Sequence, residues 1–278
     1  MYYILYNPKS NSGKTKKSVL KLQKKLSKRN IDSYLVNLFE LDKVLDIKSK
    51  LVDSDIIVIA GGDGTLHRLV NNQLFSSLKN RIFMYRSGRG NDFSRGHKGD
   101  FFEITDEIKN LPYLVNNEKK NKFLNGIGVG IDALTCQKQM ENFYSGVKES
   151  YFNIAFKAFK TFNTFSIDVN IDGVDYHYDN VWFFVVQNGK YFGGGMKVSP
   201  ESKREDDTLE LCVIHDISFK KLLTIFPIIF IGKHTIFKKC VTILKGQNFK
   251  FHLNGFNLLQ RDGEVEYVAN DIEVKRYI

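Results

Sequence analysis

The segment Asp55-Ile-Ile-Val-Ile-Ala-Gly-Gly-Asp-Gly-Thr65 decides how this sequence folds. Its first half, residues 55–60, is a nearly continuous apolar run, which is typical of a parallel strand covered on both faces. A glycine-rich turn, Gly61 to Thr65, follows, and apolar residues then recur at helical spacing from Leu66 to Leu78. This order of strand, turn and helix predicts an α/β fold whose ligands bind at the carboxyl ends of its strands.

The same alternation extends to both sides of this segment. Strands are predicted at residues 2–6, 33–37, 55–60 and 81–85, and helices at residues 14–28, 41–51 and 66–78. An order of β-α-β-α-β-α-β predicts a parallel sheet with helices on its faces. We therefore expect an α/β nucleotide-binding domain over residues 1–121.

Strand patterns dominate the second half of the chain. Asp172-Gly173 separates two alternating segments and predicts a hairpin. Further strands are predicted at residues 181–187, 208–214, 241–244 and 249–253, and helices near residues 136–162 and 219–231. We expect a β-rich, sandwich-like domain over residues 122–269, with a cleft between it and the first domain. The sequence leaves open whether residues 270–278 join the first domain.

Composition narrows the function classes. The 278 residues carry 41 Lys and Arg against 31 Asp and Glu, and the net charge of +10 favours polyanionic partners. Three widely spaced cysteines argue against a disulfide framework and a Cys-ligated metal site. Residues 1–10 do not resemble a signal peptide, and the longest apolar run, residues 222–231, is half the ~20 residues of a spanning helix. We expect a cytoplasmic protein that binds no nucleic acid, because basic and aromatic residues are not interleaved.

The glycine-rich turn carries the sharpest chemical signal. At a junction of strand and helix, glycines let the backbone approach a ligand, and free N–H groups can bind phosphate oxygens. Asp63 beside an anion would act through a metal ion or orient a hydroxyl group. The alternative is a plain turn in which Asp63 caps the helix.

Two further loops are expected at the same edge of the sheet. Gly88 to Phe93 follows the next strand, although an isolated glycine turn is the alternative for this stretch. Asn7 to Thr15 follows the first strand and ends like a P-loop, but Pro8 replaces its first glycine. The sequence therefore predicts one cleft lined by three loops and argues against a Walker-type NTPase.

Taken together, these and later motifs resemble the diacylglycerol kinase catalytic-domain family, in particular its soluble bacterial lipid kinases. The resemblance runs almost from end to end. It rests on Asn7-Pro8 with Ser12-Gly13, Gly61 to Thr65, Gly88-x-Gly90-Asn91-Asp92-Phe93, Phe123-Leu124-Asn125 with Gly128, Gly130 and Asp132, Asn188-Gly189 with Gly193 to Met196 and Pro200, and Asp262-Gly263-Glu264. The signature Gly61 to Thr65 by itself is shared with NAD kinases and phosphofructokinases, whereas the later motifs point specifically to lipid kinases.

The resemblance implies a kinase that uses ATP and Mg²⁺ to phosphorylate a lipid hydroxyl group, with diacylglycerol converted to phosphatidic acid in phospholipid biosynthesis. The residues that it implies for holding ATP are Asn7, Ser12, Gly13, Lys14, Gly61, Gly62, Gly64, Thr65, Gly88, Gly90, Asn91 and Asp92. Which lipid is phosphorylated, and whether the chain forms a homodimer, are left open by the sequence.

The resemblance also implies catalytic and metal-binding roles. Asp63 would lie near the phosphates, and Asp262, with Glu264 beside it, would accept the proton of the acceptor hydroxyl group. By sequence alone, a hairpin turn is the better explanation of Asp262-Gly263-Glu264, and the resemblance reverses this order. Lys203, Asp206 and Thr208 would hold a structural Mg²⁺, although Asp207 stands where the family commonly has glycine.

Two rival functions remain open. An NAD kinase shares the signature Gly61 to Thr65. A non-catalytic nucleotide- or lipid-binding relative would explain why Arg86, Arg89 and Asp207 depart from the family's pattern.

A lipid kinase must reach its substrate at the membrane. The lysine face of residues 14–28 and the segment Lys220 to Lys239 are candidates for peripheral binding to anionic lipid, and we favour the second because it joins cations to apolar residues.

Overall fold

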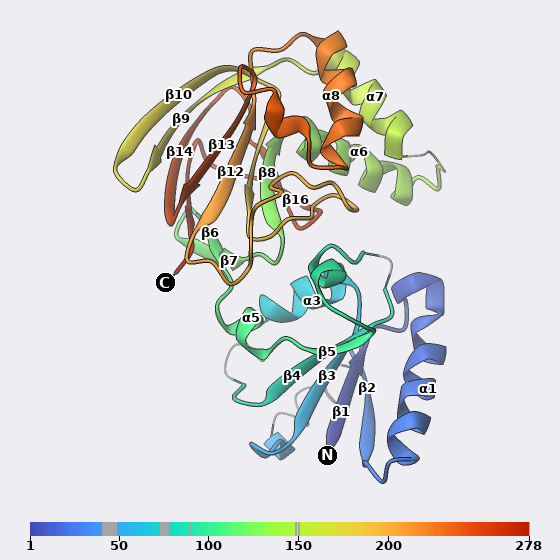
Figure 1. Ribbon diagram of the computed structural model, residues 1–278. Coiled ribbons are helices and arrows are strands. Elements are labelled where there is room, and N and C mark those ends of the chain that lie inside the picture. Colours follow the sequence, from blue (N-terminus) through green and yellow to red (C-terminus); the bar gives the residue numbers. More distant parts are fainter. Residues whose placement is uncertain (41–48, 73–77, 89, 148, 150, 278) are drawn as a thin grey trace. The chain divides into compact units, whose positions relative to one another are not determined.

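Figure 1 shows the computed structural model, which describes residues 1–278 except 41–48, 73–77, 89, 148, 150 and 278. The chain divides into two units, Met1–Asn110 and Leu111–Ile278. Each unit has its own sheet structure and its own buried core.

A five-stranded sheet with the order β2-β1-β3-β4-β5 forms the centre of the first unit. Its strands are β1 (Tyr2–Tyr6), β2 (Ser33–Asn37), β3 (Ile56–Gly61), β4 (Arg81–Arg86) and β5 (Phe101–Glu103). The first four pair in parallel, which confirms the predicted parallel sheet. The added edge strand β5 pairs antiparallel with β4.

Helix α1 (Thr15–Ser27) shows why the first unit folds as the pattern predicts. Its apolar face, Val19, Leu22 and Leu26, is buried in one cluster with Ile4 and Val58 of the sheet. The lysines of the same helix are exposed. Further helices among the residues that the structure describes are α3 (Asp63–Val70) and α5 (Thr105–Lys109), with 3-10 turns at η1 (Ser10–Gly13) and η2 (Phe93–Gly96). Most of the predicted helix 41–51, and residues 73–77 of the predicted helix 66–78, lie outside the described residues.

Two six-stranded antiparallel sheets make up the second unit. The first sheet, in spatial order, contains β10 (Val174–Val181), β9 (Phe165–Ile171), β14 (Asn248–Asn254), β17 (Asp271–Lys275), β6 (Tyr113–Asn116) and β7 (Lys119–Lys122). The second contains β13 (Val241–Gly246), β12 (Leu209–Ile214), β11 (Phe183–Gln187), β8 (Gly126–Gly130), β15 (Leu258–Arg261) and β16 (Glu264–Tyr267).

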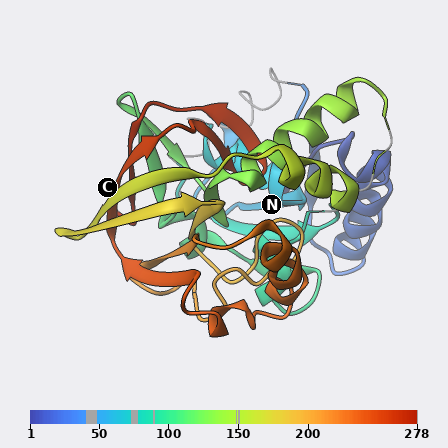
Figure 2. The ribbon, with the colours of Figure 1, turned by 90° about the horizontal axis from the view of Figure 1, so that it is seen from above.

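The two sheets share one core, as the predicted sandwich requires. Phe184 of the second sheet stacks on Phe251 of the first, with ring centroids 4.6 Å apart, and both side chains are buried. Three helices, α6 (Ile131–Tyr144), α7 (Tyr151–Thr161) and α8 (Phe219–Ile229), gather at one side of this unit in both views (Figures 1 and 2). A 3-10 turn, η3 (His234–Ile236), follows α8.

The unit boundary lies between Asn110 and Leu111, earlier than the expected position near residue 121. Strand β6 pairs with β17, and β7 pairs with β6, so both short strands belong to the second unit. Strand β17 lies between β14 and β6, and therefore it does not return to the first sheet. Neither β6 nor β7 was predicted, and the partner of a short strand is set by long-range pairing, which the sequence does not display.

Candidate functional site

Three loops of the first unit are tied together by backbone hydrogen bonds. The N–H groups of Ser87 and Gly88 donate to the carbonyl of Gly61 at 3.1 and 3.0 Å, and the N–H of Asp63 donates to the carbonyl of Gly90 at 3.1 Å. The hydroxyl of Thr15, at the start of α1, donates to the carbonyls of Ser10 and Ser87. The loops that follow β1, β3 and β4 therefore meet at one edge of the sheet, as predicted.

These loops line a hollow of about 260 Å³. Six of the predicted residues line it: Asn7, Gly62, Asp63, Gly64, Thr65 and Gly90. Ser10 and Asn11, which belong to the predicted loop Asn7 to Thr15, also line it, and so does Arg68, which was not predicted. Arg68 follows Gly64 by one helical turn on α3, so the i, i+4 relation could have revealed it.

The two glycine-rich loops that contribute to this hollow contact each other through their backbones. A Cβ atom on Gly88 would lie 2.3 Å from the nitrogen of Gly62, and one on Gly62 would lie 2.6 Å from the carbonyl oxygen of Gly90. Gly64 differs, because a Cβ atom there would meet nothing within 4 Å and the residue is exposed. Gly13 has φ of +82°, which favours glycine for conformational reasons.

Asp63 is buried, and its carboxylate holds the third loop. One oxygen, Oδ2, accepts the N–H of Asp92 at 2.8 Å and that of Phe93 at 3.3 Å. Gly62, with an extended backbone, is the N-cap of α3, so the alternative in which Asp63 caps the helix is wrong. Asp92 in turn accepts Nε of Arg95 at 3.1 Å, which fixes the loop on its other side.

Other residues predicted for the first unit lie beside the hollow. Gly61, Gly88, Asn91 and Asp92 belong to the loops that support it, while Gly13 and Lys14 lead into α1. The side chain of Ser12, like Arg89, lies outside the described residues. Arg86 donates to the carbonyls of Ser94 and His97 and thereby braces its own loop.

The Asp262-Gly263 turn of the second unit connects β15 and β16. Both residues have positive φ, 52° and 91°, as a two-residue hairpin turn requires, so the hairpin reading is confirmed. The carboxylate of Asp262 accepts the backbone N–H groups of Leu124, Asn125 and Gly126 at 2.7, 2.8 and 3.3 Å. Glu264 begins β16 directly after this turn.

The predicted metal residues lie in the loop before β12. The N–H of Asp206 donates to the carbonyl of Lys203 at 3.2 Å, and Thr208 directly precedes β12. Among the described residues, no group of three or more His, Cys, Asp or Glu side chains is arranged to hold a metal ion. The side chains therefore supply one carboxylate, that of Asp206, to the predicted site.

Asp132 is connected to the Asp262-Gly263 turn through the side chain of Gln260. Its Oδ2 accepts Nε2 of Gln260 at 3.2 Å, and Oε1 of Gln260 accepts the N–H of Gly263 at 2.9 Å. The side chain is buried, and its Oδ1 has no hydrogen-bond partner in the described part of the chain. Burial raises the pKa of Asp132 to about 7. The motif Gly128-x-Gly130-x-Asp132 pointed to this residue without indicating its environment.

The raised pKa of Asp132 predicts a loss of stability as the pH rises. The folded state holds this proton more tightly than the unfolded state, so the contribution is complete below the ordinary pKa of 3.8 and is lost as the pH rises through about 7. We expect Asp132→Asn to be more stable than the wild type at pH 8, by about 2 to 4 kcal/mol, and close to it at pH 4. Urea unfolding at both pH values measures this difference. Parallel curves for the two proteins would contradict it.

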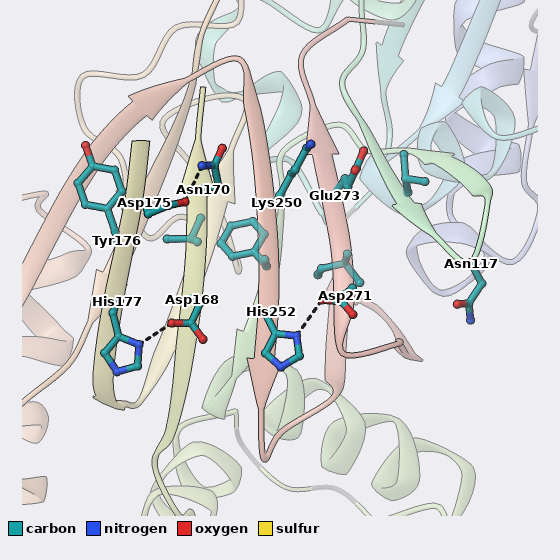
Figure 3. Close-up of a pocket in the computed structure, with 14 residues that line it drawn as sticks. Asn117, Asp168, Asn170, Asp175, Tyr176, His177, Lys250, His252, Asp271 and Glu273 are labelled. Atoms are coloured by element: carbon teal, nitrogen blue, oxygen red, sulfur yellow. Dashed lines mark hydrogen bonds and ion pairs between the residues drawn. The ribbon is translucent and has the colours of Figure 1, made fainter. Parts of the chain in front are cut away.

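A larger hollow, about 710 Å³, lies on the first sheet of the second unit (Figure 3). Two histidines pair with aspartates of neighbouring strands. Nδ1 of His177 lies 2.6 Å from Oδ1 of Asp168, and Nδ1 of His252 lies 2.7 Å from Oδ1 of Asp271. The hydrogen bond to Asp168 raises the pKa of His177, and the one to Asp271 raises that of His252. None of the predicted site residues lines this hollow, so it is separate from the candidate site.

Known proteins resemble both units. Residues 1–114 match the family described as "Diacylglycerol kinase catalytic domain", and residues 125–272 match the family described as "YegS C-terminal NAD kinase beta sandwich-like domain". The "Putative lipid kinase YtlR" of Bacillus subtilis is 26% identical over 234 residues, which cover 75% of this chain and 74% of that protein. A "Putative lipid kinase" of Staphylococcus aureus (strain JH9) is 24% identical over 252 residues and covers 82% and 80%.

The fold has relatives among solved structures. The "putative diacylglycerol kinase from Bacillus anthracis str. Sterne" superimposes with a TM-score of 0.68 and 21% identity, covering 98% of this chain and 91% of that one. This likeness agrees with the two-unit architecture of an α/β unit followed by a β sandwich.

Proposed function

This chain belongs to the family that joins a diacylglycerol kinase catalytic domain to a YegS-type C-terminal domain, and from this premise we propose that it transfers the γ-phosphate of ATP to the hydroxyl group of diacylglycerol. The product would be phosphatidic acid. The observation that supports the proposal best is the hollow of the first unit, which three loops and the start of α3 line with Asn7, Asp63 and Arg68.

The chemistry of this hollow suits a nucleotide phosphate. Phosphoryl transfer depends on positioning and on neutralising charge. Asn7 and Thr65, which line the hollow, offer polar side chains for positioning, and Arg68 offers a positive charge. We propose that Asp63 holds the Mg²⁺ that accompanies ATP, because a carboxylate is a preferred ligand of this ion. The bound Mg²⁺ would neutralise charge on the phosphate oxygens.

We propose Asp262 as the proton acceptor for the lipid hydroxyl group, with Glu264 beside it. Three backbone N–H donors hold the Asp262 carboxylate in one orientation, and a positioned side chain is what general-base catalysis requires. The hairpin turn and the catalytic role are compatible, because the turn presents the side chain that acts.

Transfer of labelled phosphate tests the proposal directly. The purified protein would be incubated with γ-labelled ATP, Mg²⁺ and one acceptor at a time: diacylglycerol in micelles, a second glycerolipid, a sphingoid base, or NAD. We expect label in phosphatidic acid. Exclusive labelling of NADP would favour an NAD kinase instead. Binding of ATP without transfer to any acceptor would indicate a non-catalytic relative.

The proposed substrate lies in a bilayer, so the protein must reach it. None of the helices in the described part of the chain is long and apolar enough to cross a membrane. In the segment Lys220 to Lys239, five lysines are exposed, and Ile231 and Ile236 are 61% and 68% exposed. Residues 217–247 contain no Asp or Glu. We propose that this segment binds an anionic membrane surface peripherally.

We expect binding to vesicles that contain phosphatidylglycerol, and release at high salt, because screening weakens the attraction. Each cation near the surface contributes about 1 kcal/mol, so replacing Lys238 and Lys239 by Gln should weaken binding by more than tenfold. Co-sedimentation with neutral and anionic vesicles at two salt concentrations measures this. Lys119→Gln with Lys120→Gln, an exposed pair outside both candidate surfaces, is the matched control and should bind like the wild type. Binding indifferent to lipid charge and salt would refute electrostatic recruitment.

A further inference from the structure

Arg276 is a buried cation enclosed by backbone carbonyl groups. It follows β17 and is only 4% exposed. Its Nε donates to the carbonyl of Asp206 at 3.0 Å, and its Nη2 donates to the carbonyl of Arg204 at 2.9 Å. Its own N–H donates to the carbonyl of Gln247 at 2.8 Å, which fixes the backbone. A guanidinium can bind two carbonyls at once because its donors form a rigid planar fork.

The loop that Arg276 holds reaches the hairpin of Asp262. The side chain of Arg204 donates to the carbonyl of Leu124 and to Oδ1 of Asn125, and it packs over Gly189, where a Cβ atom would lie 3.2 Å from its Cζ. Leu124 and Asn125 are also two of the three residues whose N–H groups donate to the carboxylate of Asp262. Arg204 and Asp262 therefore both bind the segment that contains Leu124 and Asn125.

A structural Mg²⁺ fits this loop poorly. The ion demands near-octahedral oxygen coordination. Of the neighbouring side chains, Asp207 is already bonded to the hydroxyl of Tyr277 at 2.5 Å, and the described residues form no cluster of three acidic or imidazole ligands. Two carbonyls of the loop already face the Arg276 guanidinium.

We propose that Arg276 is the built-in cation of loop 203–208 and takes the place of the structural Mg²⁺ expected at Lys203, Asp206 and Thr208. By binding the carbonyls on either side of Glu205, the guanidinium keeps the loop closed and Arg204 over Leu124 and Asn125. The fold of the second unit is then independent of divalent cations. This inference does not depend on the proposed function, because the melting temperature of the protein tests it without any measurement of kinase activity.

Thermal unfolding of the full chain tests the proposal. The wild-type melting temperature should be the same in EDTA and in millimolar MgCl₂, without nucleotide. Arg276→Met should melt several degrees lower in both buffers, since the removal leaves two partly buried carbonyls without their charged donor. Arg276→Lys keeps the charge but lacks the planar fork of donors, so its melting temperature should lie between those of the wild type and Arg276→Met. Arg29→Met, at an exposed position, is the control and should melt like the wild type.

Two results would overturn the proposal. One is a wild-type protein whose melting temperature falls in EDTA and recovers with Mg²⁺. The other is an Arg276→Met variant that is as stable as the wild type. If Arg276→Met does not fold, the comparison of EDTA and MgCl₂ on the wild type, with elemental analysis for bound Mg²⁺, still decides, because metal-dependent stability and retained metal both contradict a built-in cation.

Discussion

Replacing Asp63 by asparagine should lower kcat of the proposed kinase by about 100- to 1000-fold while the first unit remains folded. Asp63 is buried at the edge of the hollow, and its negative charge is what would hold Mg²⁺ at the phosphates. Asparagine keeps an oxygen that can accept the N–H of Asp92, so the contact between the loops survives. The substitution therefore removes stabilisation of the transition state, and its effect appears in kcat.

Steady-state phosphate transfer measures this effect, and the melting temperature monitors the fold. Asp53→Asn removes the same charge from an exposed position of the first unit and should leave kcat unchanged. A wild-type kcat in Asp63→Asn would refute the assignment. A large fall in melting temperature would mean that Asp63 serves the loop contact more than the chemistry.

The candidate site was largely predictable because its signals are local. A buried parallel strand has a continuous apolar run, and in an α/β sheet the loops after such strands meet at one edge. From Gly61 to Thr65 and from Gly88 to Phe93, the sequence therefore indicated both the loops and their meeting place. The resemblance added possible roles for the residues, and these roles remain predictions.

The remaining features depend on contacts between distant residues. The antiparallel edge strand β5, the pairing of β6 with β17, and hence the unit boundary, follow from long-range pairing. Neither the hydrogen bonds from Asp92 and Phe93 to Asp63 nor the contacts of Arg276 have a sequence spacing that reveals them. A side chain 70 residues from its partner carbonyl, as Arg276 is from Asp206, gives no local signal.

The second large effect is expected at Gly88, where alanine should destabilise the first unit by about 1 to 3 kcal/mol or prevent its folding. The added Cβ atom would lie 2.3 Å from the nitrogen and 2.4 Å from the Cα of Gly62. Backbone atoms of a central strand and its turn cannot move aside as a flexible side chain can. The two loops must separate, and the hydrogen bond from the N–H of Gly88 to Gly61 is then lost.

Gly64 provides the matched control, because it belongs to the facing loop, Gly61 to Thr65, but a Cβ atom there would meet nothing within 4 Å. Alanine there should keep the protein folded, or stabilise α3 by up to about 1 kcal/mol, since glycine is a poor helix residue. If the open space above Gly64 receives the ATP phosphates, Gly64→Ala should nevertheless raise the Kd for ATP. Urea unfolding and ATP titration of both variants separate the two kinds of glycine. Equal stability of Gly88→Ala and Gly64→Ala would contradict the backbone contact between the loops, whereas a Gly64→Ala variant with wild-type ATP affinity would remove the hollow from the proposed nucleotide site.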